Sequence, residues 1–422
     1  MGVFRGLSRK LFCPIYNKQC VNLLFCPTIR AQKRSDYCPP FWRKPKDMIK
    51  TNAILFATLF AFCIGQNVEE KNYLKKQATD PAIVDGPYVL YGNDSVFVKY
   101  IEDNSGAKTV KTDGTPAAMK NNITLQVNTD IPGKTFTVQL KQKLSDEKSE
   151  YKGIKKILVM SDIEGNFGAF RKLLQGNGVI DENFNWTFGK DHLVLVGDFV
   201  DRGTMVTEVL WLIYSLEEKA KAAGGYVHYI LGNHEIMNMS DELDYVQERY
   251  IQHAQLMNKP YMQLFGQNSE IGRWLATKNV IERVGNTLFT HGGVSGYLNS
   301  LNISLKELNE ITKPFYTDTT YRYKDDRLNL IYSDFGPFWY RNYYKAPRAN
   351  PQQIDSTLDI YNVRAITTGH TIIANEIRSL YNGKVFNVDV HHAEGRSEAL
   401  LIDDGKFWRV NTAGEKFDIK PM

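Results

Sequence analysis

Five short polar clusters in this sequence each follow a run of apolar residues, and together they carry carboxylates, one amide and imidazoles. The clusters are 161–166 (SDIEGN), 197–203 (GDFVDRG), 232–235 (GNHE), 291–293 (HGG) and 369–371 (GHT). Hard oxygen ligands combined with imidazole form a suitable set for two divalent cations. Glycines within the clusters permit sharp turns and close approach of the backbone. The residue types therefore predict a site for two divalent metal ions.

The runs before these clusters predict an α/β core. Apolar stretches at 157–160, 193–196 and 227–231 have the length of buried strands, and apolar residues recur at helical spacing in 167–174 and 206–216. Alternating strands and helices are typical of an α/β fold. Ligand crevices in open α/β folds form at strand ends, so we expect the strands to bring the polar clusters to one edge.

A small all-β module precedes this core. Short β-rich runs separated by turn residues lie at 88–91, 95–101, 123–127 and 135–140. We assign residues 66–153 to a linker and this module, with a charged, solvated connector at 141–152, and residues 154–422 to a catalytic domain. The module either packs against the core or offers a surface for docking substrate.

The first 65 residues predict export. Residues 48–65 combine a short basic start with an apolar run of about 10–12 residues, as in a secretory signal peptide, and 1–47 form a basic extension that a misassigned start codon would explain. All five cysteines lie within the first 63 residues. We expect a periplasmic or extracellular protein, held at a membrane only by lipidation at Cys63 or by an uncleaved signal anchor.

The charge distribution argues against nucleic acid as a partner. Residues 1–50 hold eleven Lys or Arg and two Asp or Glu, so their formal charge is +9. The formal charge of the whole chain is +5, so the remaining residues carry −4. A mildly acidic body lacks the basic surface that nucleic acid requires. We expect a phosphorylated small molecule or a phosphoprotein as substrate instead.

Three of the clusters, 197–203, 232–235 and 291–293, match in order the motifs of a known family. The sequence resembles the calcineurin-like metallophosphoesterases, within them the phosphoprotein-phosphatase branch, over roughly residues 154–395. The segment 336–341 (GPFWYR) is similar to a signature of the Shewanella-like phosphatases. This resemblance implies a four-layer α/β/β/α sandwich, with two mixed sheets face to face and a dimetal site on loops at one edge.

The resemblance also implies a role for each motif residue. Asp198 would bridge both metals, Asp162 would bind the first, and the second would be bound by Asn233, His291 and His370. A water held between two cations is acidified and becomes a nucleophile near neutral pH.

Four further residues complete the implied machinery. His234 would protonate the leaving oxygen, with Asp201 orienting its ring. Arg202 and Arg341 would clamp phosphate oxygens through their planar guanidinium groups. No covalent enzyme intermediate is expected.

One position departs from the family, whose first motif reads Asp-x-His where this chain has Asp162-Ile163-Glu164. We expect Glu164 to replace the imidazole as a ligand of the first metal, because side chains two apart in a strand point the same way. A third carboxylate favours Mn²⁺ or Mg²⁺, with Zn²⁺ or Fe²⁺ as alternatives. The other interpretation is a weakened first site.

The remaining histidines carry weaker predictions. His192 and His228 are expected to be structural, and His253, within a largely helical stretch at 241–285, to be exposed. His391 or His392 is a candidate to compensate for the missing imidazole, although a supporting or surface position is favoured. Asp389 is a candidate to hydrogen-bond a ligand histidine, and the aromatic segment 335–344 forms either a substrate rim or a buried plug.

These features favour a phosphomonoesterase, with phosphoproteins modified on Ser, Thr or Tyr among its candidate substrates. The first alternative is a hydrolase of nucleotides or dinucleoside polyphosphates. The second is a catalytically weak metal- or phosphate-binding protein, which only Glu164 supports. A general-acid pair such as His234 and Asp201 has no purpose in a pure binding protein.

Overall fold

The computed structural model describes residues 82–319 and 325–422. The predicted extension at 1–47, the signal peptide at 48–65 and its Cys63 lie outside these residues. The described chain falls within one compact unit that runs from Ala78 to Met422. None of the helices within the described residues is long and apolar enough to cross a membrane.

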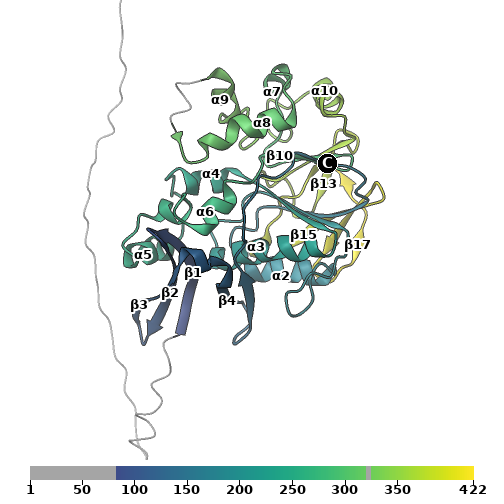
Figure 1. The fold of residues 1–422 in the computed structure, drawn as a ribbon. Coiled ribbons are helices and arrows are strands. Elements are labelled where there is room, and N and C mark those ends of the chain that lie inside the picture. The colour runs from purple at the N-terminus through teal and green to yellow at the C-terminus, as the bar shows by residue number, and fades with distance from the viewer. Residues whose placement is uncertain (1–81, 320–324) are drawn as a thin grey trace, which may run out of the picture. The chain divides into compact units, whose positions relative to one another are not determined.

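Two mixed sheets form the centre of the fold (Figure 1). The six-stranded sheet has the order β17 (Lys416–Phe417), β16 (Lys406–Asn411), β15 (Glu398–Asp403), β7 (Lys156–Met160), β8 (His192–Val196), β9 (Tyr226–Ile230). The seven-stranded sheet has the order β18 (Lys420–Pro421), β13 (Arg378–Leu380), β14 (Val385–Asn387), β12 (Ala365–Thr368), β11 (Thr287–Thr290), β10 (Ile281–Val284), β6 (Glu150–Tyr151). The predicted mixed sheets of a calcineurin-like fold are therefore confirmed.

The two sheets pack face to face through alternate residues of their strands. Val159 and Val194 belong to an apolar cluster that also contains Phe289 and Phe386 of the other sheet. Their neighbours along the same strands, such as Leu193, belong to the larger apolar cluster that includes the helices. Because successive strand residues face opposite sides, strands covered on both sides read as continuous apolar runs in the sequence.

Helices cover the outer faces of both sheets. The helices are α2 (Phe167–Gly176), α3 (Val206–Ala222), α4 (Asn233–Met239), α5 (Glu248–Leu256), α6 (Glu270–Leu275), α7 (Gly296–Ser300), α8 (Leu305–Thr312), α9 (Asp326–Ile331), α10 (Pro351–Tyr361) and the short turns η1 (Ala117–Asn122), η2 (Tyr261–Leu264), η3 (Lys313–Phe315), η5 (His392–Glu394). Helix α3 contacts β9 and α8 contacts β10. In Figure 1, α7, α8 and α9 lie together at the opposite end of the view from α2 and α3.

The N-terminal strands form a three-stranded antiparallel sheet and a separate hairpin. The sheet contains β1 (Ala82–Gly92), β2 (Ser95–Asn104) and β3 (Ala107–Pro116), and the hairpin contains β4 (Thr124–Asn128) and β5 (Thr135–Gln139). The all-β character is confirmed, although β3 lies in a stretch where the sequence pattern predicted no strand. Strand β1 packs on α3, where the Trp211 indole donates a 2.7 Å hydrogen bond to the carbonyl of Pro87.

Two local predictions are wrong because charged groups are buried with partners. Lys141, expected in a solvated connector, forms a buried ion pair with Glu217. His253, expected to be exposed, is fully buried beside the carboxylate of Asp85. The stretch 241–285 is also less helical than expected, since it ends in strand β10.

Candidate active site

Strand ends place the motif residues at one edge of the two sheets. In the six-stranded sheet, β7, β8 and β9 run parallel, and their carboxyl ends lead into Asp162, Asp198 and the helix that starts at Asn233. In the other sheet, β11 and β12 run parallel and lead into His291 and His370. The predicted clustering of these motifs at strand ends is what the fold shows.

The loops at this edge are tight enough to force unusual backbone conformations. Asp162, Asp198 and His370 have φ values of 52°, 60° and 68°, in the left-handed region that residues other than glycine rarely adopt. A Cβ atom on Gly232 would lie 2.2 Å from Asp198 Oδ1, and one on Gly369 would lie 2.3 Å from Asp162 Oδ2. Such strained conformations concentrate at functional sites, because the surrounding structure must hold them in place.

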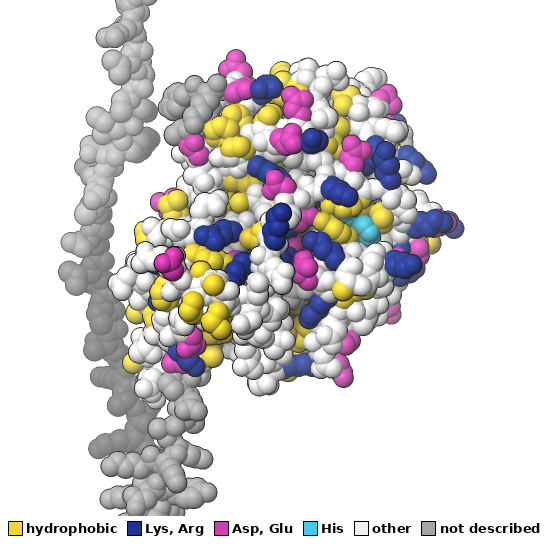
Figure 2. Space-filling model, in the orientation of Figure 1, with side chains coloured by type: hydrophobic (Ala, Val, Ile, Leu, Met, Phe, Trp, Pro, Cys, Tyr) yellow, Lys and Arg dark blue, Asp and Glu magenta, His cyan; other side chains and the backbone are white. Residues whose placement is uncertain are grey.

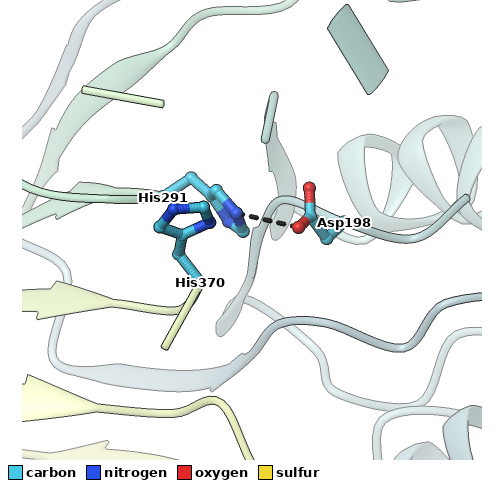
Figure 3. Close-up of side chains that lie close together, drawn as sticks. All are labelled: Asp198, His291 and His370. Atoms are coloured by element: carbon cyan, nitrogen blue, oxygen red, sulfur yellow. Dashed lines mark ion pairs between the residues drawn. The ribbon is translucent and has the colours of Figure 1, made fainter. Parts of the chain in front are cut away.

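Asp198, His291 and His370 form a buried group whose ligand atoms all lie within 4.8 Å of one another (Figure 3). The Nε2 atom of His291 lies 2.9 Å from Asp198 Oδ2 and 3.0 Å from Asn233 Oδ1. Within the described part of the chain, the buried Nε2 atom of His370 has no hydrogen-bond partner. Two imidazoles, a carboxylate and an amide oxygen that converge in this way fit a divalent cation.

Backbone contacts orient the ligand side chains. The Nδ1–H of His291 donates a 2.7 Å hydrogen bond to the carbonyl of Val196, which directs Nε2 toward the cluster. The buried carboxylate of Glu235 accepts hydrogen bonds from the backbone N–H groups of Asp198, Phe199 and Gly232 at 2.7–2.9 Å. Our sequence reasoning gave Glu235 no role, although it completes the 232–235 motif. It fixes the loop that carries Asp198.

The pKa values of the two histidines in this cluster are shifted in opposite directions. Burial lowers the pKa of the His291 imidazole, but the Asp198 carboxylate outweighs burial and raises it to about 10. Burial, then the charges of His291 and Arg341, hold the pKa of His370 well below its usual range. A cation and a proton therefore compete for the Nε2 atom of His291.

His234 and Asp201 form the predicted acid pair. The Nδ1–H of His234 donates a 2.7 Å hydrogen bond to Asp201 Oδ2, and Asn238 donates to the other oxygen of Asp201 at 2.8 Å. The Nε2 atom of His234 lies 3.8 Å from Asp198 Oδ2. Burial lowers the pKa of His234, but the charge of Asp198 and the bond to Asp201 raise it above its usual value. The ring is thus suited to carry a proton beside the metal ligands.

A cavity of about 430 Å³ opens onto these residues and contains both predicted arginines. Arg341 Nη1 donates hydrogen bonds to the carbonyl of His370 and, at 3.1 Å, to Thr371 Oγ1. Arg202 lies over the ring of Tyr245, 4.8 Å from its centroid. Asp162 also lines the cavity, and burial together with the charge of Asp198 raises its pKa to about 6 against the opposing charge of His291.

Glu164 lines the same cavity but forms an ion pair with Arg202. The expectation that Glu164 and Asp162 point the same way assumed that the strand continues, whereas β7 ends at Met160 and both residues have positive φ values. The part of that reasoning that depended on strand alternation is therefore wrong. Metal binding by Glu164 stays a prediction, and it requires the carboxylate to change its partner from Arg202 to the metal.

The segment 335–344 is mainly a buried plug. Phe338, Tyr340 and Tyr343 are buried. Trp339 is partly buried and meets the ring of His370 edge-on at a centroid distance of 5.7 Å. Most aromatic residues of this segment are thus buried, and Trp339 packs against a site histidine, while Arg341 lines the cavity.

Comparison with known proteins agrees with this geometry. Residues 155–374, more than half of the chain, match the family model described as Calcineurin-like phosphoesterase. The chain belongs to the calcineurin-like phosphoesterase family. The protein is therefore a metal-dependent phosphoric ester hydrolase by family, as the motifs predicted.

Several relatives of this phosphoesterase are phosphatases. The cold-active protein-tyrosine phosphatase of a psychrophilic Shewanella species has a solved structure that superposes with a TM-score of 0.71 and 34% identity, covering 79% of this chain and 98% of that chain. Shewanella-like protein phosphatase 1 of Plasmodium berghei is 26% identical over 302 residues, covering 67% of this chain and 82% of that protein. Shewanella-like protein phosphatase 2 of Arabidopsis thaliana is 24% identical over 292 residues, covering 58% and 73%.

Proposed function

We propose that this phosphoesterase is a phosphoprotein phosphatase that hydrolyses phosphate monoesters with two divalent cations. The observation that carries the proposal is the convergence of metal-ligating atoms around Asp198 next to the hydrogen-bonded pair of His234 and Asp201. One group of residues holds cations and the other holds a proton, as monoester hydrolysis requires.

Asp198, His291, His370 and Asn233 are the residues that would hold the second cation, with Asp198 shared and Asp162 on the first. When bound, the cations would polarise the phosphate and lower the pKa of a water molecule. Carboxylate and amide oxygens make up much of this ligand set, which supports Mn²⁺ or Mg²⁺ as the metals, with Glu164 as a predicted further oxygen ligand.

The chain's own groups bind the substrate and move its proton. Arg341 and Arg202 lie in the cavity with a charge and a planar shape that match phosphate oxygens. Arg202 would exchange its pair with Glu164 for the phosphate. His234 would give its Nε2 proton to the leaving oxygen, and Asp201 keeps the ring in the orientation that this transfer needs.

The substrate class rests on charge and on the relatives. Figure 2 shows several Lys and Arg side chains spread over one face of the molecule, and Arg202, Arg341 and Lys345 line the cavity, which suits a dianionic phosphate group. The Shewanella protein of known structure is by name a protein-tyrosine phosphatase, which supports phosphotyrosine in proteins as the first substrate to test.

Residues 66–422, stripped of metal, should be assayed with p-nitrophenyl phosphate and bis-p-nitrophenyl phosphate while Mn²⁺, Mg²⁺, Zn²⁺ or Fe²⁺ is added singly. We expect strong turnover of the monoester with Mn²⁺ or Mg²⁺, and release of phosphate from phosphotyrosine peptides. Dominant turnover of the diester would contradict a phosphatase and favour a nucleotide hydrolase. A folded protein that binds phosphate and turns over neither substrate would be a binding protein.

The compartment is a separate part of the proposal, and it rests on residues 48–65 alone. Secreted or periplasmic material should begin near Gln66 when its N-terminus is sequenced. A mature chain that begins at Met1 would contradict export by a cleaved signal peptide.

A further inference from the structure

The segment that follows β14 places a buried carboxylate in the active-site cavity. Asp389 comes two residues after the end of β14 and lines the cavity together with Asp162 and Asp198. It is only 5% exposed. Among the contacts of residues 82–319 and 325–422, its carboxylate has neither a hydrogen bond nor an ion pair, and it lines the cavity.

The surroundings of Asp389 favour a cation as the partner of its carboxylate. Five carboxylates line this cavity, those of Asp162, Glu164, Asp198, Asp389 and Glu394. Buried carboxylates in proteins are paired or coordinate metals, and a cation bound beside Asp162 and Asp198 would be a partner for Asp389.

The two arginines that line this cavity have other contacts. Arg341 donates its Nη1 hydrogens to the carbonyl of His370 and to Thr371 Oγ1. Arg202 pairs with Glu164. Glu164, at the position of the family's histidine, therefore has an arginine as its ion-pair partner, whereas Asp389 has no ion pair among the described residues.

We propose that Asp389 is a ligand of the first metal, beside Asp162 and Asp198, and supplies the donor that a histidine supplies in the first motif of related enzymes. This inference rests on the proposed two-metal function. With Asp389 as a ligand, the first metal would have more carboxylate ligands than the second, so the two metal sites would differ in their ligand types. The first then favours a hard cation such as Mn²⁺ or Mg²⁺, and the second, with two imidazoles, accepts softer ions.

His392 is the competing donor in the same segment. It is buried, lines the same cavity, and neither of its ring nitrogens has a hydrogen-bond partner in the described part of the chain. Its ring is an imidazole, the group that the first motif lacks. Measurements on His392 and Glu164 therefore accompany those on Asp389.

The test is metal binding rather than activity. Residues 66–422 are prepared as wild type and as Asp389→Asn, His392→Gln, Glu164→Gln and a surface control, Asp404→Asn, whose side chain is 79% exposed. Mn²⁺ is measured by mass spectrometry after equilibrium dialysis, and the spin coupling of paired Mn²⁺ ions is followed by electron paramagnetic resonance. Circular dichroism checks that each variant is folded.

We expect wild type and Asp404→Asn to bind two Mn²⁺ ions per chain with a coupled signal. Asp389→Asn should bind one ion, lose the coupling, and weaken the first position by more than the 10- to 100-fold that is typical when a residue only orients a ligand. A smaller loss would make Asp389 a positioning residue and overturn the proposal. The proposal would also be overturned if His392→Gln or Glu164→Gln lost one Mn²⁺ ion while Asp389→Asn still bound two.

Failure of the underlying function gives a different result. If wild type binds fewer than two Mn²⁺ ions, the two-metal function fails and the assignment of Asp389 fails with it. If wild type binds two ions but does not hydrolyse the monoester, the substrate proposal alone is wrong. The metal data on Asp389→Asn then still decide whether it is a ligand.

Discussion

Replacement of Glu235 by glutamine should destabilise the protein because one carboxylate holds two loops of the site. Oε2 accepts hydrogen bonds from the backbone of Asp198 and Gly232, and Oε1 accepts from Phe199 N and, at 2.9 Å, from Tyr229 OH. Glutamine keeps one acceptor oxygen and presents N–H groups where the other was. Two buried donors therefore lose their acceptor.

The size of this effect follows from the hydrogen bonds lost. A hydrogen bond to a charged group contributes about 1.5–3 kcal/mol, so loss of two should lower the free energy of unfolding by about 3–6 kcal/mol. Tyr229→Phe removes only one donor to the same carboxylate and should cost about 1.5–3 kcal/mol. This variant is the matched control, because it leaves the backbone contacts of Asp198 and Gly232 in place.

Denaturant unfolding of the metal-free variants, followed by circular dichroism, measures both values. We also expect Glu235→Gln to bind metal more weakly than Tyr229→Phe, since the backbone of Asp198 loses its anchor. If Glu235→Gln costs no more than Tyr229→Phe, the carboxylate does not hold these loops, and the reasoning is refuted.

Three further predictions concern the reaction and the pH dependence of stability. Asp198→Asn should abolish nearly all hydrolysis because the shared carboxylate couples both cations, and retention of most activity would refute the two-metal site. His234→Ala should slow alkyl phosphates about 10²- to 10⁴-fold but p-nitrophenyl phosphate much less, because nitrophenolate needs no proton to leave; equal losses would remove the acid role. Burial, then the charge of Asp85, raises the pKa of Glu208 from 4.5 to about 8, so this group favours folding below pH 4.5 and that contribution is lost as pH rises through 8. Glu208→Gln should flatten the fall in unfolding free energy over this window, and an unchanged pH profile would show that Glu208 ionises freely.

The elements that carry the site were predictable because their strands are covered on both sides. The apolar runs at 157–160 and 193–196 have the length that is typical of buried strands, and β7 and β8 occupy these positions. Motif residues that follow such strands must then meet at one edge. Strand β3 was missed because all its residues are exposed or half-buried, so it has no apolar pattern.

Contacts between distant parts of the chain could not be predicted from local pattern. His253 is buried because Asp85, far away in sequence, lies against it, and no spacing in the sequence links the two. The side-chain direction of Glu164 depends on the turn that follows β7, where the alternation of a strand no longer applies. Glu235 stood within a recognised motif, yet its role as an acceptor for three backbone N–H groups is visible only in the folded loops.

The buried charges behind the N-terminal strands bear on where this enzyme can be cut. Lys278 pairs at 2.7 Å with both Glu217 and Glu147, and Lys141 supplies a second partner to Glu217. A shortened chain that starts at residue 155, where the family match begins, would delete Lys141 and Glu147, so Glu217 and Lys278 would each lose one of two ion pairs. It would also strip the cover from Trp211 of α3. The smallest autonomous folding unit of this phosphatase therefore begins well upstream of its catalytic motifs, with β1.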